Sequence, residues 1–213
     1  MKYYKLTTET KVFNGVTLHR IELTKDCKWG KAGDKGGWIE KESNLTGDAW
    51  VYGNARVYGN ARVYGNARVY GGARVYGNAR VYGNARVYGD AWVYGGAWVY
   101  GDARVYGDAR VYGDARVYGD AWVYGDARVY GGAWVYGDAR VYGGAWEVSP
   151  LQIQGTRHFL NVSQKGFIQI GCIEHTFEYW KENFRTIGKE QGYSKSEIKE
   201  YGKYINLIIQ LKN

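Results

Sequence analysis

The sequence predicts a mainly β protein organised around a parallel β-helix, and three observations favour this fold class. First, residues 47–146 repeat the unit Gly-[Asn/Asp/Gly]-Ala-[Arg/Trp]-Val-Tyr in seventeen copies, of which only the last, beginning at Gly143, departs seriously. Second, a period of six is not a multiple of 3.6, and a Gly in every copy would cost a helix about 1 kcal/mol each time. Third, Ala-[Arg/Trp]-Val-Tyr alternates as a strand does, and Gly-[Asn/Asp/Gly] suits a corner. Such short strands bury their inner faces only by stacking into coils.

The repeat resembles the hexapeptide-repeat family, whose left-handed parallel β-helix has three strands in each triangular coil of eighteen residues. The resemblance implies that the valines from Val51 onward and the alanines from Ala55 onward point into the prism. The inward position continues upstream through Leu45 and Ile39, which gives about six coils up to Val141. At about 4.8 Å per coil, a solenoid of this kind is roughly 29 Å tall.

The chain divides into a β-hairpin cap over residues 1–38, the hexapeptide-repeat β-helix over 39–148, and a C-terminal cap with α-helices over 149–213. In the first segment, alternation over residues 3–6 and 16–21 predicts strands joined by a hairpin turn at Asn14-Gly15. The glycine-rich segment 31–37 is expected to be a connecting loop. A cap is needed there because the first coil would otherwise present open strand edges.

The C-terminal segment loses the six-residue period after Pro150. Short strands are expected over residues 151–155 and 166–171, where they close the last coil. Thr176 is expected to cap a helix over residues 177–191 that ends at Gly192. A second helix over residues 195–211 follows the capping box Ser194-x-x-Glu197. The two antiparallel helices are expected to cover the far end of the prism.

Two cap segments, residues 31–40 (KAGDKGGWIE) and 171–180 (GCIEHTFEYW), resemble those of uncharacterised phage and prophage proteins. Those proteins flank hexapeptide repeats with similar caps, and the resemblance covers nearly the whole chain. It implies no established activity, and it implies the host cytoplasm as the location of a phage-encoded protein. No apolar run approaches the roughly 20 residues of a membrane span, and the N-terminus lacks a signal-peptide core. We therefore expect a cytoplasmic protein without a membrane partner.

Outward rows of Arg, Trp and Tyr are expected on all faces of the prism, because residues eighteen apart stack directly. Trp92, Trp98 and Trp122 each fall between arginines of the neighbouring coils. Each ring can lie against guanidinium planes, which is worth about 0.5–1 kcal/mol at exposed sites. A self-stabilising ladder and a binding surface both fit these rows.

Positive charge is concentrated in the early coils of a chain whose net charge is +8. Residues 53–88 carry six arginines and no acid, whereas residues 89–146 carry five arginines and seven aspartates. We call the six early arginines the arginine collar and expect it to bind anions. The candidate contacts for a partner are Arg56, Arg62, Arg68, Arg74, Arg80, Arg86, Tyr58, Tyr64, Tyr70, Trp92 and Trp98.

Catalytic and metal-binding signals are sparse. Hexapeptide acyltransferases resemble this chain in the coil, but they use a catalytic His and a loop inserted between coils. Neither occurs between Gly47 and Gly143. Cys172, His175 and His158 form the only ligand-like group, one ligand short of a structural zinc site, since Cys27 lies at the opposite end. We expect no metal and no cofactor.

The sequence therefore predicts a non-enzymatic, phage-type interaction module. Its Arg/Tyr/Trp-covered β-helix is expected to bind a host protein, for example of a defence system, or nucleic acid. An acyltransferase relative and a structural spacer are the alternatives. A prism face or the C-terminal helices are the surfaces on which we expect any homo-oligomer to form.

Overall fold

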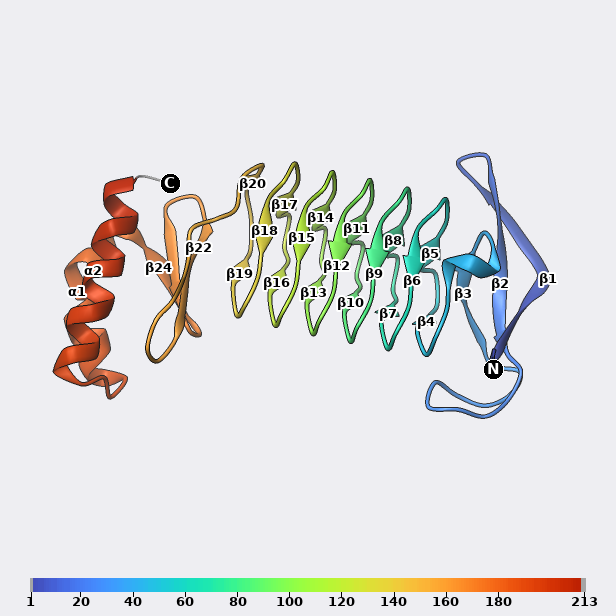
Figure 1. The fold of residues 1–213 in the computed structure, drawn as a ribbon, viewed down its shortest axis with the longest axis horizontal. Helices are drawn as coiled ribbons and strands as arrows, with labels where there is room; N and C mark the ends of the chain where they lie inside the picture. Colours follow the sequence, from blue (N-terminus) through green and yellow to red (C-terminus); the bar gives the residue numbers. More distant parts are fainter. Residues whose placement is uncertain (1, 212–213) are drawn as a thin grey trace.

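The six-residue copies form a stack of three-sided coils between two caps in the computed structural model, which describes residues 2–211 (Figure 1). Each regular copy contributes a two-residue strand, from β4 (Trp50–Val51) to β19 (Arg140–Val141). Strands three copies apart pair in parallel, so that Trp92 lies opposite Arg74 on one side and Arg110 on the other. This confirms a mainly β solenoid of about six coils. The expected left-handed sense is compatible with this arrangement.

The pairing divides the coil strands among three parallel sheets, which we call faces 1, 2 and 3. Face 1 consists of β5 (Arg56–Val57), β8 (Arg74–Val75), β11 (Trp92–Val93), β14 (Arg110–Val111), β17 (Arg128–Val129) and β20 (Ala145–Trp146). Face 2 consists of β4, β7 (Arg68–Val69), β10 (Arg86–Val87), β13 (Arg104–Val105), β16 (Trp122–Val123) and β19. Face 3 consists of β6 (Arg62–Val63), β9 (Arg80–Val81), β12 (Trp98–Val99), β15 (Arg116–Val117) and β18 (Trp134–Val135).

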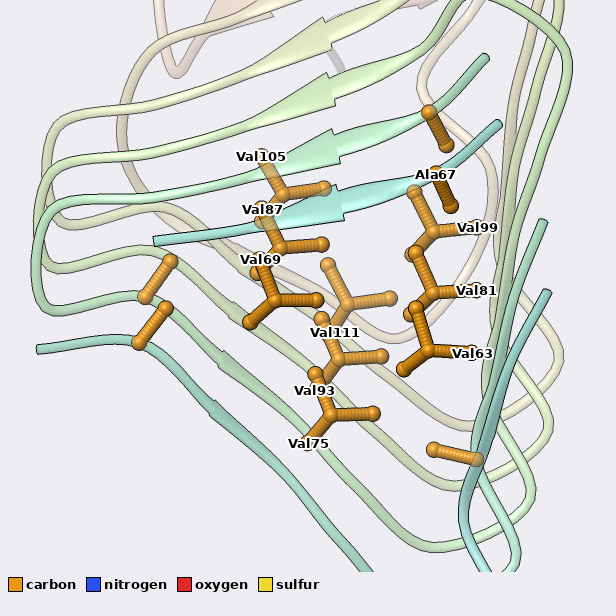
Figure 2. Packing of buried hydrophobic residues seen from close by; sticks show 14 of the residues in the cluster. Val63, Ala67, Val69, Val75, Val81, Val87, Val93, Val99, Val105 and Val111 are labelled. Carbon is orange, nitrogen blue, oxygen red and sulfur yellow. The ribbon is translucent and has the colours of Figure 1, made fainter. Parts of the chain in front are cut away.

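The core of the solenoid is a narrow column of valine and alanine side chains. Every inward Val and Ala from Ala49 to Val141 has a solvent exposure of 0%. Ile39 and Leu45 continue the column at 0% and 1%. Figure 2 shows that the valines of successive coils stack on one another in vertical rows. The predicted inward positions are confirmed.

Each corner turns at a glycine because the backbone there is left-handed and no side chain fits between the coils. Repeat glycines from Gly47 to Gly137 have φ between 54° and 71°. A Cβ placed on Gly71 would lie 2.9 Å from the carbonyl oxygen of Gly89 in the next coil. An alanine at such a corner would strain the backbone and push two coils apart.

The N-terminal cap is a hairpin that extends face 1. β1 (Tyr4–Phe13) and β2 (Val16–Leu23) pair antiparallel across a turn in which Asn14 and Gly15 have φ of 50° and 77°. β2 pairs with β3 (Lys35–Ile39), and β3 runs parallel to β5 of the first coil. A short 3-10 helix, η1 (Glu42–Asn44), follows β3. The predicted hairpin and its turn are confirmed, and β1 is longer than expected.

The glycine-rich segment 31–37 is only in part the expected loop, because β3 begins at Lys35 and includes the buried Gly36 and Gly37. A Cβ on Gly36 would lie 2.5 Å from Cγ1 of Ile21. A Cβ on Gly37 would lie 2.5 Å from Cγ1 of Val51. These glycines therefore let the hairpin and the first coil approach each other closely, a packing role that composition alone does not distinguish from a loop.

The C-terminal cap begins with a four-stranded antiparallel sheet. Its strands are β21 (Gln152–Gln154), β22 (Phe159–Gln164), β23 (Phe167–Ile170) and β24 (Ile173–Thr176). The expected strands correspond to β21 and β23, whereas the sequence pattern does not predict β22 and β24. In β22 the five residues from Phe159 to Ser163 are all buried, so the strand lacks the alternation that would have marked it.

The predicted helices and their ends are confirmed by α1 (Phe177–Glu190) and α2 (Lys195–Leu211). Thr176 Oγ1 accepts a hydrogen bond from the Tyr179 amide at 3.1 Å, and Gly192 ends the first helix with φ of 69°. At the second helix, the Ser194 amide donates to a Glu197 carboxylate oxygen at 2.6 Å, as a capping box requires.

The position of the helices corrects the prediction. They pack on the outer side of the four-stranded sheet, and the sheet lies between them and the last coil (Figure 1). The Tyr142 amide in that coil donates to the Ser163 carbonyl at 3.0 Å, and Phe159 joins the solenoid core. The sheet therefore covers the prism, and it is joined to the last coil by this backbone bond and by side-chain hydrogen bonds rather than by a continued strand ladder.

Amide side chains satisfy the backbone groups left over at the two ends of the solenoid. Asn44 Nδ2 donates to the Ala61 carbonyl at 2.9 Å at the first coil. At the last coil, Asn161 Nδ2 donates to the Arg140 carbonyl at 2.7 Å, and its Oδ1 accepts from the Arg140 amide at 3.2 Å. The asparagine therefore makes the hydrogen bonds that a further strand would make. The edge is then less able to pair with another chain.

Within residues 2–211, no helix combines the length and apolar character that a membrane crossing needs.

Replacing Val93 by Asp should lower the free energy of unfolding by several kcal/mol, roughly 3–5, because it places an unpaired charge in a dry core. The control, Arg110→Ala, changes an outward residue of the next coil and should cost under about 1 kcal/mol. Chemical denaturation followed by circular dichroism measures both. Equal midpoints for the two variants would contradict the division into inward and outward positions.

Replacing Asn161 by Ala should destabilise the end of the solenoid by about 1–3 kcal/mol, because the amide and carbonyl of Arg140 lose their partner. The matched control is Asn54→Ala, which removes the same side chain from an exposed corner. Thermal melts of the two variants give the comparison. A melting temperature for Asn161→Ala no lower than that of the control would show that the edge does not depend on this cap.

Candidate functional site

The outward rows of the solenoid are ladders in which Arg and Trp side chains stack on one another. On face 1, the Trp92 ring lies between the guanidinium groups of Arg74 and Arg110, whose central carbons are 4.6 and 4.8 Å from the ring centroid. The same arrangement occurs at Trp98 between Arg80 and Arg116, and at Trp122 between Arg104 and Arg140. The stacking predicted from the eighteen-residue spacing is therefore confirmed.

Tyrosines form a second set of ladders beside the Arg/Trp rows. The rings of Tyr64 and Tyr82 are 4.8 Å apart and within 3° of parallel, and Tyr70 stacks on Tyr88 in the same way. Burial, and after it the neighbouring tyrosines, raises the pKa of Tyr76 and Tyr106 to about 12. A stacked ring exposes its edge and hydroxyl group rather than its face. A partner therefore meets rows of hydroxyl and guanidinium groups, with few free ring faces.

The arginine collar is distributed over the whole circumference of the prism. Face 1 carries Arg56 and Arg74, face 2 carries Arg68 and Arg86, and face 3 carries Arg62 and Arg80. Arg62 and Arg80 are exposed, and the other four are half-buried. A partner lying along one face therefore meets two of the six collar arginines, rather than the continuous patch that the sequence suggests.

The N-terminal cap covers part of the collar. The Phe13 ring of the hairpin lies under the guanidinium groups of Arg56 and Arg74, at 4.2 and 5.0 Å. Tyr58, a candidate contact from the sequence, is buried beneath the same Phe13 ring, with the centroids 6.0 Å apart. On face 2, Arg68 lies 4.9 Å from the centroid of Trp29.

The hairpin also contributes cations that sequence reasoning missed. Lys11 Nζ is 4.0 Å and the Arg20 guanidinium carbon 5.0 Å from the centroid of Trp38. Arg20 lies opposite Trp38, which in turn lies opposite Arg56, so the outward row of face 1 continues into the cap. In the sequence, Trp38-Ile39 keeps the register of the Trp-Val pairs in the repeats. This register indicates that the outward row extends into the cap, where Lys11 and Arg20 lie. The pairing of β2 with β3 has no such periodic signal.

Carboxylates do not pair directly with the coil arginines. Among the described residues, the ion pairs within 4.0 Å are Lys2–Glu42, Lys5–Glu22, Lys28–Asp48, Lys35–Glu9 and Arg157–Glu197. All five involve cap residues, and the aspartates of the late coils are exposed at the corners. The late coils therefore offset their arginines only at longer range, and no described carboxylate lies within 4.0 Å of a coil guanidinium group in either half.

A groove where face 2 meets the C-terminal cap gathers charges of both signs. Its lining includes Arg104, Arg140, Arg157, Asp120 and Asp138. The groove therefore has less anion selectivity than the early coils.

The ligand-like group of Cys172, His175 and His158 does not form a metal site in the described residues. His158 packs against the Tyr193 ring, with the centroids 5.7 Å apart, and the exposed Cys172 follows the neighbouring Gly171. His175 lies in β24 and stacks on Tyr179 at 4.2 Å. Throughout residues 2–211, no three His, Cys, Asp or Glu side chains come close enough together to hold an ion. The N-terminal cap, which contains Cys27, and the C-terminal cap, which contains Cys172, lie at opposite ends of the molecule (Figure 1).

Comparison with known families supports the repeat architecture. Nine overlapping segments between residues 49 and 148 match the family model described as YdcK Beta solenoid repeat. This chain is a β-solenoid repeat protein. The match covers the coils and not the caps, so the resemblance of the caps to phage and prophage proteins stays a prediction. A search of curated proteins gave no match.

Raising the pH should unfold the solenoid between about pH 10 and 12, because unfolded tyrosines ionise near 10. Tyr76 and Tyr106 have pKa values of about 12 in the folded ladders. A raised folded pKa contributes stability that is intact below the unfolded pKa and is lost as the pH passes through the folded one. Tyrosinate absorbance and circular dichroism, recorded together, test this. Ladder tyrosines that ionise near pH 10 in a chain that keeps its fold would contradict it.

Proposed function

We propose that this protein is a non-enzymatic interaction module whose solenoid binds a polyanion, namely nucleic acid, along its rows of guanidinium groups. The observation that carries the proposal is the stacking of coil arginines on tryptophan rings without direct carboxylate partners among the described residues, as at Arg74, Trp92 and Arg110. Stacking uses the flat face of the guanidinium group and leaves the N–H donors at its edge. Those donors match the oxygens of a phosphate group.

The geometry supports binding through phosphates rather than bases. Direct reading of base edges needs side chains that enter a groove, and the repeated rows present the same groups in every coil. The stacked tyrosines also leave few ring faces on which a base could lie. Binding should therefore depend little on nucleotide sequence and strongly on salt.

An enzymatic role finds less support in the coils. The described coil strands are two residues long and follow one another in regular register, so there is no inserted loop between Trp50 and Val141 to shape a cleft. No His lies in that range, although the transferases that the repeat resembles use one. A host protein as partner, and a structural spacer, are the outcomes that remain if nucleic acid is not bound.

Retention of nucleic acid at low salt should fall steeply as salt is added, because bound phosphates release counterions. Converting Arg56, Arg62, Arg68 and Arg74 to Gln should weaken retention more than converting Arg104, Arg110, Arg116 and Arg128, since aspartates offset the late coils. Electrophoretic mobility shifts with a duplex of mixed sequence measure both. Melting temperatures of both variants establish that they fold, since Arg56 and Arg74 of the early set also contact Phe13 of the cap.

Wild-type protein that binds no duplex or single strand at low salt would refute the nucleic-acid proposal. Equal loss in both quadruple variants would mean that total charge, rather than the early coils, determines retention. Removing one complete coil, residues 89–106, separates the module from a spacer. If the protein is a binding module, the shortened variant should still retain nucleic acid. If it is a structural spacer, neither the wild type nor the shortened variant should retain nucleic acid, and only the distance between the caps should change.

A further inference from the structure

We propose that the junction of the N-terminal hairpin with face 1 is a phosphate-binding site, formed by Lys11, Arg20, Arg56 and Arg74, that takes the backbone of nucleic acid. This inference rests on the function proposed above and narrows it to one end of one face. It does not follow from the arginine collar alone, because two of the four cations come from the cap.

The four cations lie in one patch because the hairpin continues the outward row of the coils. Arg20 is opposite Trp38 in the β2–β3 pair, Trp38 is opposite Arg56 in the β3–β5 pair, and Arg56 is opposite Arg74. Lys11 reaches the same place from β1, with its ammonium group over the Trp38 ring. Neighbouring strands are about 4.8 Å apart, so Arg56 and Arg74 are one strand spacing apart. Arg20 and Arg56 are two spacings apart, because Trp38 lies between them.

Two aromatic rings support the cations without neutralising them. Trp38 lies against Lys11 and Arg20, at 4.0 and 5.0 Å from its centroid. Phe13 lies against Arg56 and Arg74, at 4.2 and 5.0 Å. A ring quadrupole attracts a cation but carries no net charge, so four positive charges remain around two rings.

Nearby carboxylates are engaged elsewhere. Glu9 pairs with Lys35 at 2.7 Å and Glu22 with Lys5 at 2.8 Å. Glu40 accepts the Gly59 amide at 2.6 Å. Among the described residues, none of the four cations has an ion-pair partner within 4.0 Å.

The corners that flank this end of face 1 are uncharged as well. They carry Asn54, Asn60, Gly72 and Asn78, and the first aspartate of the neighbouring corners is Asp90. Asp90, whose Oδ1 would clash with a Cβ placed on Gly72, is the one corner carboxylate that borders this end of face 1 among the described residues.

The side chains of the four cations are each partly buried. The Nε atoms of Arg20, Arg56 and Arg74 are buried and have no partner among the described residues. Burial first, and then the charges of Arg56 and Arg20, lower the pKa of Lys11 to about 8, while Glu9 raises it. The fold thus holds like charges together against their repulsion, and a bound anion would relieve that repulsion.

The nature of the patch favours a linear phosphate chain over the surface of an acidic protein. Its charges form a row that continues past Trp92 to Arg110 and Arg128 on the same face. A row of charges along one face can meet several successive phosphates of a nucleic-acid backbone. Trp38 is only 7% exposed, so its ring face is not free to stack on a base.

The experiment compares two quadruple variants with the same change in charge. The site variant is Lys11→Gln, Arg20→Gln, Arg56→Gln and Arg74→Gln. The control is Lys181→Gln, Arg185→Gln, Lys189→Gln and Lys203→Gln, which change exposed cations of α1 and α2 outside the proposed binding surface. Affinity for a mixed-sequence DNA duplex and for inorganic tripolyphosphate is measured by fluorescence anisotropy and calorimetry over a range of salt. Melting temperatures establish that both variants fold.

We expect the site variant to lose at least about tenfold in duplex affinity, and the slope of log affinity against log salt to fall by about 3–4. The control should change the affinity by less than about threefold. Tripolyphosphate should raise the melting temperature of the wild type and the control, but not of the site variant.

Three results would overturn the proposed site, the proposed function or both. Equal losses in both variants would refute the site and leave polyanion binding intact. Tripolyphosphate binding without duplex binding would refute nucleic acid as the ligand, and with it the proposed function. Wild-type protein that binds neither probe would refute both the site and the function.

Discussion

The dry column of valine and alanine inside the prism is the constraint on which the rest of the structure depends. It admits one branched and one small side chain per repeat, and every such position is fully buried. Because the column repeats every eighteen residues, each outward side chain meets the side chain at the same repeat position on the next coil. The tyrosine ladders are a direct consequence, and so is the charge repulsion that would follow from uninterrupted arginine rows.

The chain limits that repulsion differently in its two halves. In the later coils, tryptophans separate the arginines and aspartates stand at the corners, as around Trp92, Trp122 and Asp108. In the earliest coils the cap provides the aromatic rings, through Phe13 and Trp38, but it also brings Lys11 and Arg20. Four cations without an ion-pair partner among the described residues therefore gather where the hairpin joins face 1, at the site proposed for phosphate.

The features that repeat in the sequence, together with local helix caps, are the ones that could be predicted. The inward valines, the sandwiched Trp92 and the corners follow from counting in sixes and eighteens, and the helix ends follow from local capping residues such as Thr176. Features that depend on long-range pairing of unique segments were not predictable. β22 has both faces buried and no alternation, and the approach of Arg20 to Trp38 depends on an antiparallel register without a repeat. The candidate site was therefore half predictable, since its coil arginines are periodic and its cap cations are not.

The direction of the coil-to-coil hydrogen bonds has a mechanical consequence. Bonds such as that from the Arg74 amide to the Ala91 carbonyl, 2.9 Å long, join each coil to the next and run along the long axis of the molecule (Figure 1). A pulling force applied to the two caps loads these coil interfaces in series, so the rod is as strong as its weakest interface. Once an interface opens, one coil of eighteen residues is released, which adds roughly 60 Å of extended chain. Under tension the solenoid would lengthen in equal steps, one coil at a time.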